Sequence, residues 1–471
     1  KVDLLTKSYT DAPAVKWSCD GSVEYTLEEI DKKDRGTEVI LHLNEEDEQY
    51  LESARIKELL NKFCKFLPIP VWFENEQINA VEPIWVKKPS DLKDEDYTNF
   101  YRELYPLSFE QPLFHIHLNV DYPFNLTGVL YFPRLDNKMD IQRNKIKLYC
   151  NRVFVSESVE GIVPDFLMLL HGVIDSPDIP LNVSRSYLQG DPNVKKISSH
   201  ITKKVSDKLA EMNRTNPEDY HSKWEDIKMF VNYGLVTEDK FADKYKDFFL
   251  FKSINEDKWY NVDAYVEKIS ATQKDKNGKT VILYSNDPVI HHSYISSAKE
   301  YGYDVILMNT PLDAHVINKL ESLNADWKFS RVDADSLDKL IDKGETRVDL
   351  LSEEEKTTLK GLFESVADKE TYVFETEAMS DKDAPVVVTE NEFMRRMQEM
   401  NAVGGGGFMG AFPEKFQVKI NTNHAVYQKL LKEEGDKNAK VEYLFYLGLL
   451  NRNMLKGEEL SKFMKHSLNL I

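Results

Sequence analysis

Two short apolar segments in the second half of the chain flank a stretch with helical spacing, and this pattern constrains the fold most strongly. The segments are "TVILYS" at 280–285 and "DVILMN" at 304–309, with "SYISSAKEYG" at 293–302 between them. Apolar strands joined by a helix are typical of a parallel sheet that is covered on both faces. The pattern predicts a parallel α/β unit over residues 266–320.

The whole chain is too long for this unit alone. Its 471 residues correspond to about three domains at roughly 150 residues each. Apolar residues make up 41% of the chain and charged residues 30%, which is typical of a folded protein rather than a disordered one. We therefore expect a multidomain fold of the α+β and α/β classes.

Charge and cysteine content limit the partners and the compartment. A formal net charge of -19 argues against a nucleic-acid partner. The longest apolar run, at 163–174, contains Asp165 and His171 and is too short to cross a membrane. We expect a buried helix there and no membrane partner. The cysteines lie far apart, which is typical of a reducing compartment, and we expect a cytoplasmic protein.

The remaining segments differ in their periodicity. Residues 1–43 alternate as short strands, and an amphipathic helix follows at 45–67. A polar, proline-broken stretch at 75–88 is typical of a linker. Residues 89–210 mix strands and helices, residues 211–265 are helical and rich in aromatic side chains, and the chain ends in helices.

The segment "EFMRRMQEMNAV" at 392–403 is a predicted helix with one apolar side. Phe393, Met397 and Met400 fall at helical spacing with Met394 beside them, and charged residues take the other side. Methionine suits variable partners because its side chain is flexible and polarisable, but an ordinary core-facing stripe explains the same spacing. A glycine run at 404–407 follows, so we expect little ordered chain to hold this helix in place.

The last segment, from residue 439 onward, contains two predicted helices on either side of Gly457. The first helix is apolar almost all round and includes Leu444, Leu447 and Leu450. Such a helix must be buried, either in the core of its own domain or in a subunit interface. Because the last domain is small, we favour the interface and expect a homodimer.

The segment "DSPDIPLNVSRSYLQ" at 175–189 places a cation at the start of a predicted helix. Arg185 lies in the first turn, where the helix dipole disfavours a positive charge, and Gln189 lies on the same face four residues later. A local ion pair with Asp175 or Asp178 would explain the arginine. An anionic ligand would explain it equally, because a guanidinium stays charged and offers several donors to a phosphate.

Four motifs together resemble the ninety-kilodalton heat-shock chaperones. They are "GTEVILHL" at 36–43, "KLYCNRVFV" at 147–155, "DFLMLLHGVIDSPDIPLNVSRSYLQ" at 165–189 and "NGKTVILYS" at 277–285. The third motif is very specific to the family, and the resemblance covers essentially the whole chain. It implies an ATPase domain, a middle domain and a dimerisation domain, in that order.

The resemblance also implies that the first domain is cut. The asparagine helix, the DxGxG segment and the glycine-rich lid end of the family's ATP site would all precede residue 1. We therefore expect a fragment that neither binds nor hydrolyses ATP alone. The implied divisions are 1–74 for the remnant of the α/β ATPase sandwich, 75–88 for the linker, 89–345 for the α-β-α middle domain (89–210 large α/β, 211–265 helical connector, 266–345 second α/β unit) and 346–471 for the α+β dimerisation domain.

Individual residues acquire roles through the same resemblance. Thr37 matches a threonine that lines the adenine pocket, Arg185 matches the catalytic arginine that reaches the ATP γ-phosphate, and Gln189 matches its polar helper. Trp85 matches a client-contacting tryptophan. Client contact also carries over to the apolar side of the 392–403 helix, which consists of Phe393, Met394, Met397 and Met400. The dimerisation residues are Leu444, Leu447 and Leu450.

These roles imply an ATP-dependent molecular chaperone that binds unfolded or partly folded client proteins in a dimeric clamp. The intact protein would be an ATPase with ATP and Mg²⁺ as its cofactors. We expect no metal site of the chain's own, because His115 and His117 share a strand face without a third ligand at suitable spacing. The alternative is a dimeric protein-binding module without catalysis.

Overall fold

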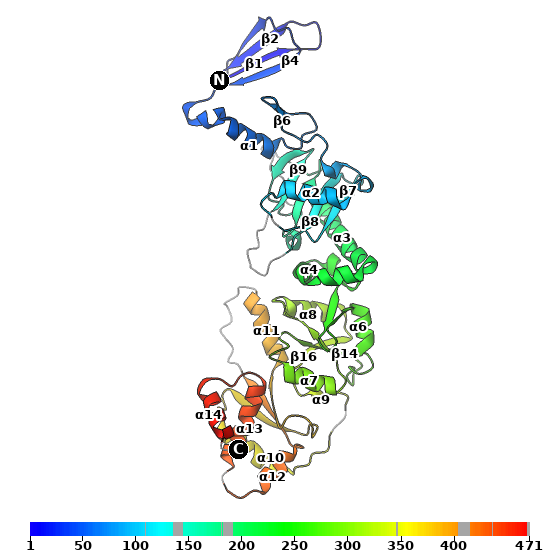
Figure 1. Ribbon diagram of the computed structural model, residues 1–471, viewed down its shortest axis with the longest axis vertical. Helices are drawn as coiled ribbons and strands as arrows, with labels where there is room; N and C mark the ends of the chain where they lie inside the picture. Colours follow the sequence, from blue (N-terminus) through cyan, green and yellow to red (C-terminus); the bar gives the residue numbers. More distant parts are fainter. Residues whose placement is uncertain are drawn as a thin grey trace.

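The computed structural model describes most of the chain. The described residues are 1–108, 110–134, 145–179, 181, 192–344, 347–403, 415–435 and 437–468. They form an elongated molecule in which the larger sheets follow one another along the long axis, with the N-terminus at one end and the C-terminus towards the other (Figure 1). Helices and several sheets are present, which confirms the predicted α+β multidomain class.

A four-stranded antiparallel sheet in the order β3-β2-β1-β4 forms the N-terminal end. Its strands are β1 (Val2–Lys7), β2 (Ala14–Cys19), β3 (Thr26–Ile30) and β4 (Gly36–Leu41). The register places Leu4, Trp17 and Val39 side by side, so one face of this sheet is apolar. The helices η1 (Glu45–Leu51) and α1 (Ser53–Phe63) then lead from this sheet to the next unit (Figure 1).

The region predicted as a linker is packed against the next unit. It contains the strand β6 (Glu76–Gln77), which pairs with β5 (Trp72–Phe73) just before it, and the turn η2 (Ile84–Val86), and is followed by η3 (Pro89–Asp91) and α2 (Asp94–Leu104). Asn79 is 6% exposed, and its side-chain amide donates to the backbone oxygens of Leu67 and Ile69. Its polar side chain therefore satisfies buried backbone groups rather than facing water.

A five-stranded sheet in the order β10-β9-β11-β8-β7 forms the next unit. Its strands are β7 (Phe114–Val120), β8 (Leu126–Phe132), β9 (Lys145–Cys150), β10 (Val153–Ser156) and β11 (His171–Asp175). β11 runs parallel to β9 and antiparallel to β8, so it lies in the middle of the sheet.

The predicted buried helix at 163–174 is wrong. The structure has the short turn η4 (Asp165–Leu167) there, followed by β11, in which every residue is buried. A strand covered on both faces is apolar along its whole length, so periodicity does not separate it from a buried helix. Pairing with β8 requires a glycine at position 172. Its φ is +133°, and a Cβ there would lie 2.0 Å from the backbone oxygen of Val129 in β8.

Helices connect this sheet to a second five-stranded sheet. They are α3 (Pro192–Thr215), α4 (Pro217–Thr237), α5 (Asp239–Ala242) and η5 (Tyr245–Asp247). One continuous apolar core runs from the first sheet through α3 and α4 into the second sheet. The two sheets therefore share packed contacts along the connection.

The second five-stranded sheet has the order β13-β12-β15-β14-β16. Its strands are β12 (Leu250–Ser253), β13 (Lys258–Asn261), β14 (Thr280–Ser285), β15 (Val305–Leu307) and β16 (Trp327–Arg331), and its helices are α6 (Val262–Ile269), α7 (His292–Glu300), α8 (Asp313–Leu323) and α9 (Leu337–Leu340). β14 runs parallel to both β15 and β16, which confirms the predicted parallel α/β unit.

A three-stranded sheet in the order β17-β19-β18 and the helices around it form the C-terminal unit, which has its own apolar core. Its elements are α10 (Glu353–Val366), β17 (Tyr372–Glu377), β18 (Val386–Glu390), α11 (Glu392–Val403), β19 (Phe416–Asn421), α12 (Ala425–Lys432), α13 (Asn438–Asn451) and α14 (Gly457–Leu468). α11 extends from this unit to lie against α8 of the preceding unit (Figure 1). The glycine run at 404–407 lies outside the described residues.

Replacing Gly172 with alanine should destabilise the central strand β11. The added Cβ would overlap the Val129 backbone oxygen, and a residue with a Cβ is strained at a φ of +133°. We expect a loss of about 3 kcal/mol or more of unfolding free energy in urea denaturation. Gly361→Ala in α10 is the control, because nothing lies within 4 Å of its Cβ position. Equal midpoints for the two variants would contradict this account of β11.

Candidate functional site

The helix α11 carries most of the predicted client-contacting residues, and charged side chains set its placement. The helix follows Asn391, whose side-chain oxygen accepts a hydrogen bond from the backbone N of Met394 at 3.1 Å. Arg395 is 4% exposed, although arginine is rarely buried without partners. The charged side of α11, rather than its apolar side, therefore faces the protein.

The guanidinium of Arg395 is held by two acids of its own helix and by the neighbouring sheet. Its Nη1 contacts Glu399, and its Nη2 lies 2.7 Å from Oε1 of Glu392. Nη2 also donates to the hydroxyl of Tyr284 in β14, and the guanidinium lies 5.6 Å from the centre of that ring. Tyr284 in turn donates to Glu392 at 2.9 Å.

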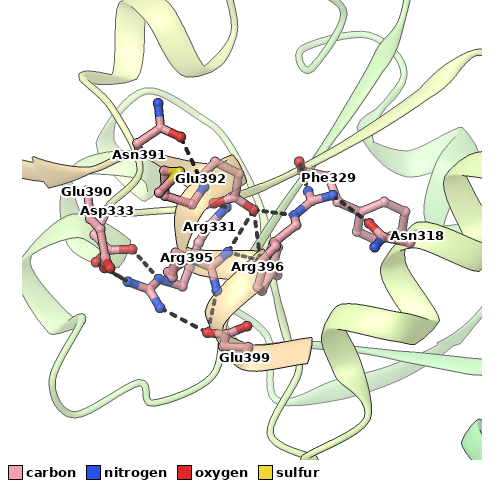
Figure 2. A network of polar contacts seen from close by, with 12 residues as sticks. Asn318, Phe329, Arg331, Asp333, Glu390, Asn391, Glu392, Arg395, Arg396 and Glu399 are labelled. Atoms are coloured by element: carbon pink, nitrogen blue, oxygen red, sulfur yellow. Dashed lines mark hydrogen bonds and ion pairs between the residues drawn. The ribbon is translucent and has the colours of Figure 1, made fainter. Parts of the chain in front are cut away.

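Arg396 contacts other elements of the unit that contains β14. Its Nη1 lies 2.9 Å from Oε2 of Glu321 in α8, and its Nη2 donates to the backbone oxygen of Phe329 in β16. Its Nε lies 2.7 Å from Glu392. Together with Arg395 this arginine ties α11 to β14, β16 and α8, and Figure 2 shows both guanidinium groups pointing into the resulting network.

Burial and the neighbouring charges shift the pKa of Glu392 in opposite directions. Burial by itself raises the pKa of a carboxyl group, but Arg395 and Arg396 outweigh it, and the pKa of Glu392 falls below its ordinary value. Burial raises the pKa of the Tyr284 phenol, so its hydroxyl keeps the proton that it donates. Glu392 is therefore charged and paired at neutral pH.

The apolar side of α11 is exposed at Phe393 and half-buried at its methionines. Phe393 is 71% exposed, and Met394 and Met397 are partly exposed. Met400 is also partly exposed, and the side-chain nitrogen of Asn318 in α8 lies 3.0 Å from its sulfur. We call Phe393, Met394, Met397 and Met400 the apolar stripe. An amphipathic helix normally buries this side, so Phe393 departs from an ordinary core face, while the three methionines are only partly exposed.

The residues that dock α11 were not singled out from the sequence. We expected little ordered chain to hold this helix, and that expectation is wrong. The signal was present in the spacing, because Glu392, Arg395, Arg396 and Glu399 recur at intervals of three and four residues and share one side of a helix. Their partners in β14, β16 and α8 lie too far along the chain for spacing to reveal.

Trp85 lies in a core rather than on the surface. It is 0% exposed and packs among the rings of Phe66, Phe100 and Tyr149. Its indole Nε1 donates to Oδ2 of Asp175 at 3.2 Å. A side chain without exposed surface does not touch a partner, so direct client contact by Trp85 is incompatible with this conformation.

The predicted phosphate-contacting residues Arg185 and Gln189 lie outside the described residues. The two acids considered as local partners of Arg185 are described. Asp175 is buried and accepts a hydrogen bond from the backbone N of Arg152 at 3.1 Å. Asp178 accepts one from the backbone between β7 and β8 at 2.5 Å. Both carboxylates thus have partners within the described fold.

Thr37 lies on the apolar face of the N-terminal sheet. Its hydroxyl lies 2.7 Å from that of Thr6. Val39 and Leu41 follow at intervals of two residues, so they lie on the same face, and they are 60% and 62% exposed. Thr37 therefore belongs to an open sheet face that remains in contact with water.

The three predicted dimerisation leucines of α13 have different environments. Leu444 is 7% exposed and packs into the core of its own unit, Leu447 is partly buried, and Leu450 is 42% exposed. All three line a groove of about 670 Å³, to which Val289 and Ile290 before α7 also contribute. α13 thus fills its own core with one side and presents Leu450 at the groove.

The two candidate metal-binding histidines interact with one tyrosine. His115 is stacked on the ring of Tyr97, and Nδ1 of His117 lies 2.9 Å from the hydroxyl of that residue. Burial lowers the pKa of His115 to about 4, so its imidazole is neutral at physiological pH. The described part of the chain contains no cluster of three or more side chains suited to hold a metal ion.

Among the described helices, none has the length and apolar character needed to cross a membrane.

Comparison with known proteins identifies the class to which this succession of sheets and helices belongs. The family model described as Hsp90 protein matches residues 71–456, and the chain belongs to this family. The match confirms the resemblance to the ninety-kilodalton heat-shock chaperones that the sequence motifs indicated.

The individual relatives that the chain resembles are bacterial proteins. The chain is 48% identical to Chaperone protein HtpG of Porphyromonas gingivalis over 456 residues, which cover 93% of this chain and 66% of the relative. It is 41% identical to Chaperone protein HtpG of Bacteroides thetaiotaomicron, with 100% of this chain and 82% of the relative covered. A more distant relative from Clostridium perfringens is 28% identical. The chain spans just under two thirds, 66%, of the length of the first of these relatives.

Proposed function

We propose that this chain belongs to an ATP-dependent molecular chaperone that binds unfolded or partly folded client proteins. Membership of the Hsp90 family and the likeness to proteins named Chaperone protein HtpG support the chaperone activity. The observation that carries client binding is the orientation of α11, whose charged side is docked while Phe393 of its apolar stripe faces water.

The chemistry of the apolar stripe suits an unfolded partner. Unfolded chains expose apolar side chains, and contact with Phe393 would remove apolar surface of both partners from water. The methionines beside it adapt to partners of different shape, because their side chains are flexible and polarisable. Since α11 is held by its charged side, a client can reach the stripe without prior unfolding of the helix.

Replacing Phe393 and Met397 together with serine should weaken client binding. Burying one phenylalanine side chain is worth roughly 1.5–3 kcal/mol, so about tenfold more protein should be needed to suppress the aggregation of an unfolded test protein. Leu107→Ser is the matched control, because Leu107 is an exposed apolar residue (88%) in another unit. Suppression by the double variant at wild-type concentrations would contradict client contact by the stripe.

We further propose that the whole protein hydrolyses ATP with Mg²⁺ as its cofactor. The motif at 165–189 and the family match support Arg185 and Gln189 as contacts of the γ-phosphate, and the motif at 36–43 supports Thr37 as a contact of the adenine. A guanidinium stabilises the charge that develops on a transferring phosphoryl group. We expect the present chain alone not to bind ATP, because the face that carries Thr37 is open to water.

Replacing Arg185 with alanine should lower ATP turnover in protein that carries its complete nucleotide-binding domain. We expect a loss of about a hundredfold or more, the scale on which donors to a developing charge act. Arg185→Lys should lose less, because it keeps the charge without the planar fork of donors. Wild-type turnover of the alanine variant would show that Arg185 takes no part in hydrolysis.

The alternative function, a dimeric binding module without catalysis, requires that no variant of the intact protein turns over ATP.

We propose a homodimer in which Leu447 and Leu450 lie at the contact between subunits. Light scattering of this chain should then give about twice 54.7 kDa. Leu450→Lys should shift the equilibrium to the monomer, because it places a charge in an apolar contact. Leu107→Lys, which changes an exposed residue of another unit, should leave the dimer intact. A monomeric wild-type chain at micromolar concentration would refute the dimer.

We also propose a cytoplasmic location, which cell fractionation tests. No disulfide links Cys19, Cys64 and Cys150, which all lie in described parts of the chain, as is typical of a reducing compartment. Recovery of the protein from an oxidising compartment would exclude this location.

A further inference from the structure

The order of the second five-stranded sheet places a topological switch point at the carboxyl ends of β14 and β16. β14 lies between β15 and β16, so the connections that follow β14 and β15 lead to opposite sides of β14. In open α/β sheets, ligands bind outside the carboxyl ends of the strands at such a switch point. In this protein, side chains of the C-terminal unit occupy that place.

Asp333, just after β16, is a deeply buried charge at this switch point. It is 1% exposed, and its Oδ2 accepts a hydrogen bond from Nη2 of Arg331 at 2.8 Å. Nη2 of Arg452, the residue after α13, lies 3.0 Å from the same oxygen. Arg452 also donates to the backbone oxygen of Val388 at 3.1 Å and contacts Glu390 at 2.9 Å. One carboxylate of the sheet thus anchors the C-terminal unit.

Arg331 extends this anchor to α11. Its Nη2 lies 3.2 Å from Glu390 at the end of β18, and its Nη1 lies 3.5 Å from Glu399 of α11. Its backbone N donates to Glu392 of α11 at 3.4 Å. A single residue therefore contacts Asp333, the C-terminal sheet and the docked side of α11, as Figure 2 shows.

The burial of these charges makes their contacts cooperative. Arg331, Asp333 and Arg452 are 7%, 1% and 8% exposed. Burial acts to raise the pKa of Asp333, but the two arginines outweigh it and hold this pKa well below its usual range. Removal of one charge leaves the others buried without compensation, so the contacts are lost together rather than one by one.

We propose that Arg331 is a positioning residue that couples the docking of the C-terminal unit to the presentation of the apolar stripe. When Arg452 leaves Asp333, Arg331 keeps Asp333 but the contact that both arginines share with Glu390 is lost, and the charged side of α11 loses part of its anchor. The orientation of the stripe then depends on whether the junction between the two units is closed. This inference rests on the proposed client contact by α11.

Hydrogen exchange of the α11 backbone amides tests the coupling without any client. Arg452 contacts Asp333, Val388 and Glu390, which all lie outside α11. We nevertheless expect Arg452→Met in the 471-residue chain to speed exchange at residues 394–401 about tenfold or more. Arg331→Met should have the same effect. Arg331→Lys should restore part of the protection, because it keeps the charge with fewer donors.

Two comparisons separate the coupling from a general loss of stability. Arg347→Met is the matched control, because Arg347 pairs with Asp338 at the surface of the same unit, and it should leave exchange in α11 at the wild-type rate. Combining Arg452→Met with Glu390→Gln should speed exchange no more than the stronger single variant, because Glu390 lies outside α11 and contacts both Arg331 and Arg452. Wild-type exchange in Arg452→Met, or additive effects in the combination, would overturn the coupling.

Glu390→Gln carries the test if Arg331→Met does not fold. Its side chain is 19% exposed and lies outside α11, and the substitution preserves its shape, so we expect the variant to fold. Faster exchange in α11 supports the coupling, and wild-type exchange contradicts it. The serine variant of Phe393 and Met397 should keep wild-type exchange while it loses client suppression. Failure of the client proposal is therefore distinguishable from failure of the coupling.

Discussion

Buried pairs of arginine and carboxylate groups decide how the C-terminal unit sits on the second five-stranded sheet. Arg331, Asp333 and Arg452 lie at the centre of these pairs, and each is less than 10% exposed. Charges buried to this extent are stable only together, because one left unpaired loses its hydration without compensation. The orientation of α11, and with it the surface available to a partner, depends on this set of contacts.

The same contacts explain why α11 reverses the usual arrangement of an amphipathic helix. A surface helix normally buries its apolar side because that removes the most apolar area from water. In α11 the ion-paired guanidinium groups of Arg395 and Arg396 occupy the buried side, and Phe393 remains exposed. A helix held in this way keeps an apolar surface available while it stays folded, which is the property that a chaperone contact requires.

Short-range patterns predicted the elements whose identity depends on neighbouring residues. The parallel unit around β14 and the existence of α11 follow from apolar spacing within single segments. β11 was mistaken for a helix because a strand buried on both faces has no alternation to read. Trp85 was expected at a client surface through a family likeness, but Phe66 and Tyr149, from segments remote in sequence, enclose it.

The sequence by itself determined the family, the α+β class and the division of α11 into an apolar side and a charged side. Motif identity and helical periodicity are properties of single segments, so they can be recognised from the sequence without knowledge of the fold. Only the tertiary structure decided which side of α11 is docked. The partners that decide it, Tyr284, Glu321 and Phe329, come from two strands and a helix that only the folded sheet brings together. Periodicity describes one element at a time, and pairing of buried charges depends on several elements at once.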